Sequence, residues 1–207
     1  NMAVMVKKSF PNATQVIDRF HVQKLAFEAV QEIRIKYRWE AMDKENKEIE
    51  LAREFKKKYI PEVLDNGDTL RQLLARSRYL LFKQRSKWTY SQRQRAELLF
   101  ERYPLIEKAY DLSIDLGRIY SKTKDRSVAL TKLAQWYDKV EKASIKSFAV
   151  TAKSIQENYS SILQFFTNRS TNASAESFNA KIKAFRAQFR GVNNIPYFLF
   201  RLSKIFA

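Results

Sequence analysis

The stretch HVQKLAFEAVQEIRIKY at residues 21–37 decides the fold, because its apolar side chains recur with the period of an α-helix. Residues three or four positions apart share one helix face: Val22, Leu25, Ala29, Ile33 and Tyr37. The spacing predicts a long helix from His21 to about Lys58. Its second half, from Asp43 onward, is nearly all charged and is therefore expected to be exposed.

The same period recurs along most of the remaining chain. Apolar stripes, caps and breaks predict further helices at residues 70–81, 92–102, 105–122, 128–142, 144–166 and 172–190. The one β-type run is residues 14–17. Only 3 Gly and 4 Pro occur in 207 residues, which is too few for the turns of a sheet-rich fold. We therefore expect a mainly α protein with at most one short strand.

The charge balance points to a polyanionic partner. Lys and Arg number 39 against 22 Asp and Glu, a net charge of +17, and the excess is not confined to a tail. Nucleic acid is the commonest partner for such a surface. A basic surface that merely keeps the protein soluble is the alternative.

Several classes of function are excluded by composition. The absence of Cys excludes disulfide scaffolds, thiol catalysis and Cys-based zinc sites, and the single histidine, His21, excludes a histidine cluster. No apolar run approaches the roughly 20 residues of a membrane span, so we expect no membrane partner and a cytoplasmic location. The first residue is Asn, which suggests a cut end.

The segment NRSTNASAESFNAKIKAFRAQFRG, residues 168–191, differs from the rest. On a helix its phenylalanines form one stripe with an isoleucine: Phe178, Ile182, Phe185 and Phe189. At about 100° per residue, five polar residues fall within an arc of about 80° on another side: Glu176, Asn179, Lys183, Arg186 and Arg190.

This polar face suits two kinds of chemistry. A carboxylate near a helix start can hold Mg²⁺, and cations further along can bind phosphates. A lone glutamate cannot perform two-metal phosphodiester chemistry, which needs several carboxylates. The structural alternative is a surface helix whose acid and bases suit the helix dipole.

Two motifs resemble those of insertion-sequence transposases of the ISL-three group. FPNATQVIDRFHVQKLAFEAVQEIR (10–34) resembles the family's signature around DRFH, and TNASAESFNAKIKAFRAQFRG (171–191) resembles its closing motif around a glutamate. Between them, ERYPLIEKAYDLSIDL (101–116) and Trp136 resemble the family's helical insertion. The matches stand in the family's order and together cover nearly the whole chain.

The resemblance implies an RNase H-like core with an Asp-Asp-Glu triad and Mg²⁺ or Mn²⁺. Glu176 matches the family's final catalytic glutamate and metal ligand. The family's two aspartates lie near strands that precede the FPNA motif, and no such strands are found here. We therefore expect the C-terminal part of such a transposase, inactive alone. The intact enzyme would cleave transposon ends, join them to target DNA and possess a capacity for self-association.

The same resemblance implies a division of the chain and a set of DNA contacts. Residues 1–40 would be a remnant of the RNase H-like core (a helix, a short strand and the start of the long helix). Residues 41–167 would be an all-helical insertion domain, and residues 168–207 would be C-terminal core helices carrying Glu176. The expected DNA-binding residues are Arg169, Asn179, Lys181, Lys183, Arg186 and Arg190.

Asp18 and His21 are further candidates for catalysis. Asp18 follows the β-type run, and His21 lies three residues later. The structural alternatives are that Asp18 caps the long helix and that His21 is a buried, hydrogen-bonded histidine. Both alternatives stay open at this point.

The aromatic residues of the helices could stack on bases, but core packing is the commoner role of such side chains. We therefore expect six of them in the core: Tyr37, Trp39, Trp88, Tyr90, Trp136 and Tyr137. Two other functions remain open. One is a non-catalytic basic helical module that binds nucleic acid, and the other is a helical protein-interaction scaffold.

Overall fold

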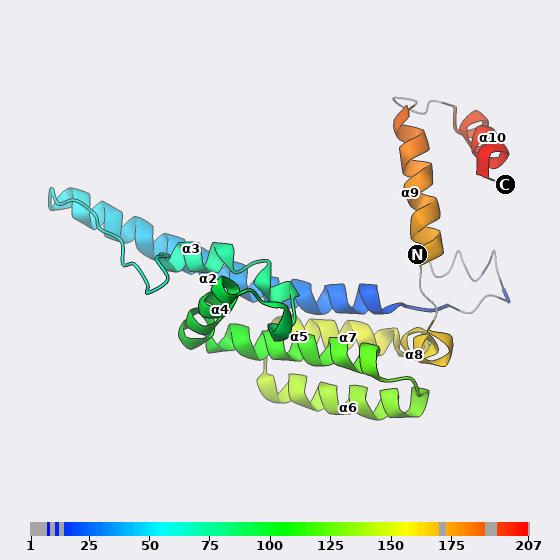
Figure 1. Ribbon diagram of the computed structural model, residues 1–207, viewed down its shortest axis with the longest axis horizontal. Coiled ribbons are helices and arrows are strands. Elements are labelled where there is room, and N and C mark those ends of the chain that lie inside the picture. The colour runs from blue at the N-terminus through cyan, green and yellow to red at the C-terminus, as the bar shows by residue number, and fades with distance from the viewer. Residues whose placement is uncertain (1–7, 9–10, 13–14, 170–172, 189–193, 207) are drawn as a thin grey trace. The chain divides into compact units, whose positions relative to one another are not determined.

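Figure 1 shows the computed structural model of the chain, which describes residues 8, 11, 12, 15–169, 173–188 and 194–206. The chain forms two compact units, Asn1–Arg169 and Ser170–Ala207. Regular structure in the described ranges consists of α-helices and two short 3₁₀ turns, without a β-strand. The prediction of a mainly helical fold is therefore confirmed. No helix in these ranges is both long and apolar enough to cross a membrane.

The residues before the long helix form no strand where they are described. The N–H of Ile17 donates to the carbonyl oxygen of Ser161 at 3.1 Å, so this run is fixed against a helix end. Thr14, the first residue of the expected strand, lies outside the described residues. Residues 1–7, 9, 10 and 13 also lie outside them, so the helix expected before the strand in the core remnant stays a prediction.

Helix α2 (Arg19–Glu54) is the long helix, blue to cyan in Figure 1. It begins after Asp18, whose carboxylate accepts the N–H of His21 at 3.1 Å. All its buried side chains lie in the first half: Val22, Ala26, Ala29, Val30, Ile33 and Arg34. The second half is largely exposed, as predicted. The helix ends four residues before the expected Lys58, and Lys56 follows in the left-handed region (φ 52°).

The segment after α2 is less regular than its sequence suggests. Helix α3 covers only Leu70–Arg76, and the 3₁₀ turns η1 (Leu80–Phe82) and η2 (Arg85–Lys87) follow. The prediction of one helix through residue 81 is wrong. The hydroxyl of the buried Ser77 donates to the carbonyl oxygen of Leu73 at 2.6 Å, at the point where α3 ends.

Five helices complete the first unit, and short caps separate them. Helix α4 (Tyr90–Arg102) opens on a capping box between Thr89 and Gln92. Helices α5 (Pro104–Lys122), α6 (Arg126–Ala143), α7 (Lys146–Glu157) and α8 (Tyr159–Asn168) follow. The prediction of one helix over residues 144–166 is therefore wrong. Asn158 separates α7 from α8, and its side-chain amide donates to the carbonyl oxygen of Ser154 at 2.8 Å.

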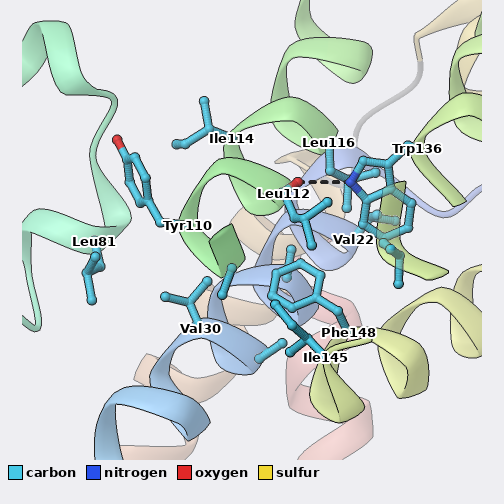
Figure 2. Packing of buried hydrophobic residues seen from close by; sticks show 14 of the residues in the cluster. Val22, Val30, Leu81, Tyr110, Leu112, Ile114, Leu116, Trp136, Ile145 and Phe148 are labelled. Carbon is cyan, nitrogen blue, oxygen red and sulfur yellow. Dashed lines mark hydrogen bonds between the residues drawn. The ribbon is translucent and has the colours of Figure 1, made fainter. Parts of the chain in front are cut away.

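The core of the first unit lies where α2, α5, α6 and α7 pack side by side (Figures 1 and 2). Trp136 is 1% exposed, and its indole N–H donates to the carbonyl oxygen of Leu112 at 2.9 Å. Trp88 is also buried, as predicted. The core assignment is wrong for Trp39 and Tyr90, which are 60% and 77% exposed on outward faces of their helices.

A buried carboxylate fixes the connection between α2 and α3. Asp68 is fully buried, accepts the Arg95 Nε–H at 2.9 Å and forms an ion pair with Arg76. The side-chain amide of Asn66 donates to the same carboxylate at 3.1 Å. Burial alone would raise the pKa of Asp68, but the hydrogen bonds from Arg95 and Arg76 hold it below its ordinary value.

The second unit contains α9 (Ala173–Gln188) and α10 (Ile195–Phe206). Phe185 of α9 is 8% exposed, and its ring lies 5.5 Å from the ring of Phe198 of α10, measured between centroids. These two helices therefore share a small aromatic contact. Because α9 is one uninterrupted helix, its side chains have the helical register that the sequence predicts.

Candidate nucleic-acid interface

Helix α9 carries most of the residues predicted to act on DNA. Within it, Glu176, Asn179, Lys183 and Arg186 fall within an arc of about 80° around the helix axis. Glu176 lies in the N-terminal part of the helix, where the dipole favours a carboxylate. The structure describes the backbone of Glu176 but not its side chain, and Arg190 lies outside the described residues.

The described cations of α9 are available to a ligand. Asn179, Lys181, Lys183 and Arg186 are all exposed. Among the residues that the structure describes, none of the three cations has an ion-pair partner. Lys181 lies about 160° around the axis from Lys183, so it points away from the row formed by Lys183 and Arg186. Of the three described cations of α9, only Lys183 and Arg186 therefore lie on the same face of the helix.

The apolar stripe of α9 is only partly buried. Phe185 is buried and Ile182 is half-buried, whereas Phe178 is 44% exposed. Phe189 lies outside the described residues. The predicted division of α9 into a phenylalanine side and a polar side therefore holds best in the middle of the helix.

Asp18 and His21 form a capping pair at the start of α2. The Nδ1 atom of His21 lies 2.7 Å from Oδ1 of Asp18, which also accepts the backbone N–H of His21. The interpretation of Asp18 as a helix cap is confirmed. The interpretation of His21 as a buried histidine is wrong, since its side chain is 53% exposed. A catalytic role for either residue stays a prediction.

Arg169 is engaged by the first unit. Its guanidinium donates to the carbonyl oxygens of Thr123 at 3.0 Å and Tyr120 at 3.2 Å. Both carbonyls belong to the C-terminal end of α5, where such groups lack helical partners. The guanidinium also lies 5.6 Å from the centroid of the Phe165 ring. Arg169 therefore has a structural role, and its expected contact with DNA stays a prediction.

The comparison with known families gives one match. The sequence profile of the ISL-three group of DDE transposases, described as Transposase, matches residues 1–202. The chain belongs to this transposase family. No curated protein and no solved structure gave a match. Membership of a transposase family implies DNA as the partner, which is consistent with the net charge of +17.

The described residues of this transposase-family chain do not by themselves fit a metal ion. Within the described ranges there is no group of three or more His, Cys, Asp or Glu side chains that could hold one. Divalent-metal phosphodiester chemistry uses several carboxylates around ions about 4 Å apart. The expected role of Glu176 as a metal ligand stays a prediction, because the structure does not describe its side chain.

A second basic surface was missed by the sequence reasoning. Arg19 at the start of α2 and two lysines near the 3₁₀ turns, Lys83 and Lys87, line one groove with Phe20 and Phe82. More than 60 residues separate the α2 members from the others in sequence, and no motif links them. Only the packing of η1 and α5 against α2 brings them together.

Proposed function

We propose that this chain acts in DNA cleavage and strand transfer by a DDE transposase, with α9 as the element that meets the DNA. The observation that carries the proposal is the register of α9, which aligns Glu176 with Asn179, Lys183 and Arg186. The family match over residues 1–202 supports it. A carboxylate followed by cations on one helix face suits a phosphodiester substrate whose backbone continues along the helix.

The polar residues of this segment have different roles in the proposal. Lys183 and Arg186, with Arg190 beyond them, bind phosphates, and Asn179 orients either the carboxylate or the DNA. Lys181, on another side of the helix, contacts a separate part of the DNA. Glu176 is one ligand of the Mg²⁺ or Mn²⁺ that the family uses.

A second candidate is a non-catalytic helical module that binds nucleic acid. The observation in its favour is that the described residues contain no acidic cluster for a metal. Both candidates require the cations of α9 to bind DNA, and they differ in whether Glu176 takes part in chemistry.

The test measures DNA affinity as a function of salt. Fluorescence anisotropy with a labelled duplex gives the slope of log affinity against log salt, which reports the number of phosphate contacts. The double variant Lys183→Ala/Arg186→Ala should reduce this slope by up to about two. The matched control is Lys57→Ala/Lys58→Ala, which removes the same charge from exposed positions after α2.

The two variants separate a site from bulk charge. A reduced slope in the α9 variant and an unchanged slope in the control would support the proposal. Equal reductions would make α9 an ordinary basic surface. Failure of the wild-type chain to bind duplex DNA at about 50 mM salt, where phosphate contacts are strong, would contradict both candidate functions.

A further inference from the structure

A groove of about 440 Å³ runs along the first unit between α2, the 3₁₀ turns and α5. Its walls combine three cations, Arg19, Lys83 and Lys87, with the rings of Phe20 and Phe82. Neither the family match nor the α9 interface accounts for this surface. The first unit alone forms it, so its geometry does not depend on the position of α9.

The cations of the groove have no acidic partner in the described part of the chain. The residues that line the groove include no Asp or Glu, and none of the three cations forms an ion pair with a described residue. Lys83 makes a single long hydrogen bond, 3.3 Å from its Nζ to the Gln92 side-chain oxygen. This concentration of unpaired positive charge is complementary to an anion.

The phenylalanines of the groove are accessible. Phe20 is 64% exposed and Phe82 is 38% exposed, whereas Phe100, Phe148, Phe165 and Phe166 of the same unit are buried. The ring of Phe27 packs edge-on against Phe82, with centroids 5.2 Å apart, and thereby fixes the orientation of the Phe82 ring. Exposed aromatic faces beside cations are the arrangement that binds unpaired nucleotides, because bases stack on the rings while phosphates meet the charges.

The polar wall of the groove is fixed by a contact between α2 and α5. The side-chain amide of Gln23 donates to the carbonyl oxygen of Ser113 at 3.0 Å. A Cβ atom at Gly117 would lie only 2.4 Å from the side-chain oxygen of Gln23. The glycine therefore allows the glutamine to lie against α5, and the groove has at least one wall that is already ordered.

We propose that this groove binds an unpaired segment of the DNA strand. Phe20 and Phe82 stack on bases, and Arg19, Lys83 and Lys87 bind the flanking phosphates. A duplex keeps its base faces covered, so it would leave both rings without partners. An acidic peptide would satisfy the cations but not the rings. The inference rests on the proposed function, since it takes DNA as the partner.

The experiment compares three labelled ligands with the full chain: a thymidine oligonucleotide of ten residues, an abasic strand of the same length, and a duplex. Wild type should prefer the thymidine strand to the abasic one. Phe20→Ala should weaken binding of the thymidine strand by about 5-fold or more and leave the abasic strand and the duplex unchanged. The control is Phe55→Ala, which truncates an equally exposed ring (70%) at the other end of α2.

The cations are tested with Lys83→Ala/Lys87→Ala, which should weaken both single strands and reduce their salt slope by up to about two. Circular dichroism checks that each variant keeps the wild-type fold, which the exposure of these side chains favours. A charge effect without a Phe20 effect would identify an anion surface or a peptide site and overturn the proposal.

Binding to the duplex distinguishes a failure of this inference from a failure of the proposed function. Duplex binding that depends on α9, together with equal affinity for thymidine and abasic strands, would overturn the groove proposal alone. Equal losses in Phe20→Ala and Phe55→Ala would also overturn it. Loss of all DNA binding by wild type would overturn both proposals.

Discussion

Two arginines of the helical bundle (α2–α8), Arg34 and Arg85, carry the same charge as the cations of α9 but differ from them in their partners. In the bundle, Arg34 is buried and donates to the carbonyl oxygen of Leu74 at 2.8 Å. Arg85 pairs with two carboxylates and lies 5.1 Å from the centroid of the Phe100 ring. Lys183 and Arg186 of α9 are exposed and have no ion-pair partner in the described ranges.

The comparison shows why net charge alone is a poor guide to a binding surface. A cation that already has a carboxylate or a buried carbonyl contributes to folding and has fewer donors left for a ligand. A cation in solvent contributes little to stability and can exchange its counterions for phosphates. Substitutions of paired groups in the bundle and of exposed cations in α9 should therefore change different measurements.

The largest expected effect lies in the bundle, at Asp68. Asp68→Asn keeps the size of the side chain but removes the charge between Arg76 and Arg95. Because Arg95 is largely buried, its unpaired charge should lower the free energy of unfolding by about 3 kcal/mol, measured by urea denaturation. The control is Asp115→Asn, which removes surface pairs with Arg118 and Lys139 and should change the free energy of unfolding by less than about 1 kcal/mol. Equal effects would contradict the assignment of Asp68 as a buried anchor.

The same carboxylate predicts a dependence of stability on pH. The pKa of Asp68 is lower in the folded protein than its ordinary value. Its stabilising contribution should therefore be complete above the unfolded value, about pH 4, and should be lost as the pH falls through the folded pKa. Urea midpoints from pH 7 to pH 2.5 should show the difference between wild type and Asp68→Asn shrinking in acid. A difference that stays constant would rule out this linkage.

These two effects could not be predicted from the sequence, although much of the fold could. Apolar periodicity predicts α2, α5 and α6 because it reports burial of one helix face directly. The ends at Ser77 and Asn158 depend on single side-chain bonds to the backbone, which periodicity does not report. The grouping of Asp68 with Arg95 depends on tertiary contacts across 27 residues.

The candidate site likewise has features that the sequence predicts and features that it does not. The arc that contains Glu176, Lys183 and Arg186 follows from helix geometry alone, so the sequence was sufficient for it. The engagement of Arg169 by α5 and the groove beside Phe20 depend on contacts between distant elements. No local sequence pattern predicts such contacts.

A smaller effect is expected at Arg169. This residue is a candidate for both classes of cation, those that stabilise the fold and those that bind DNA. Arg169→Ala removes the donors to the carbonyl oxygens of Tyr120 and Thr123, both in buried residues. The free energy of unfolding should fall by about 1–2 kcal/mol, while the salt slope of duplex binding should stay at the wild-type value. A slope reduced by about one, with stability unchanged, would instead assign Arg169 to the DNA interface.

The smallest expected effect is that of Glu176→Gln on cleavage of DNA by this chain. Wild type and variant should both fail to nick supercoiled plasmid with Mg²⁺ or Mn²⁺, because one carboxylate cannot complete a site that needs several. The DNA affinity of the variant should equal that of wild type, since phosphate binding depends on cations. The control is Glu157→Gln, at an exposed position near the end of α7. Nicking by wild type that survives Glu157→Gln and disappears in Glu176→Gln would mean that Glu176 has carboxylate partners within this chain, and α9 would then be part of a complete catalytic centre.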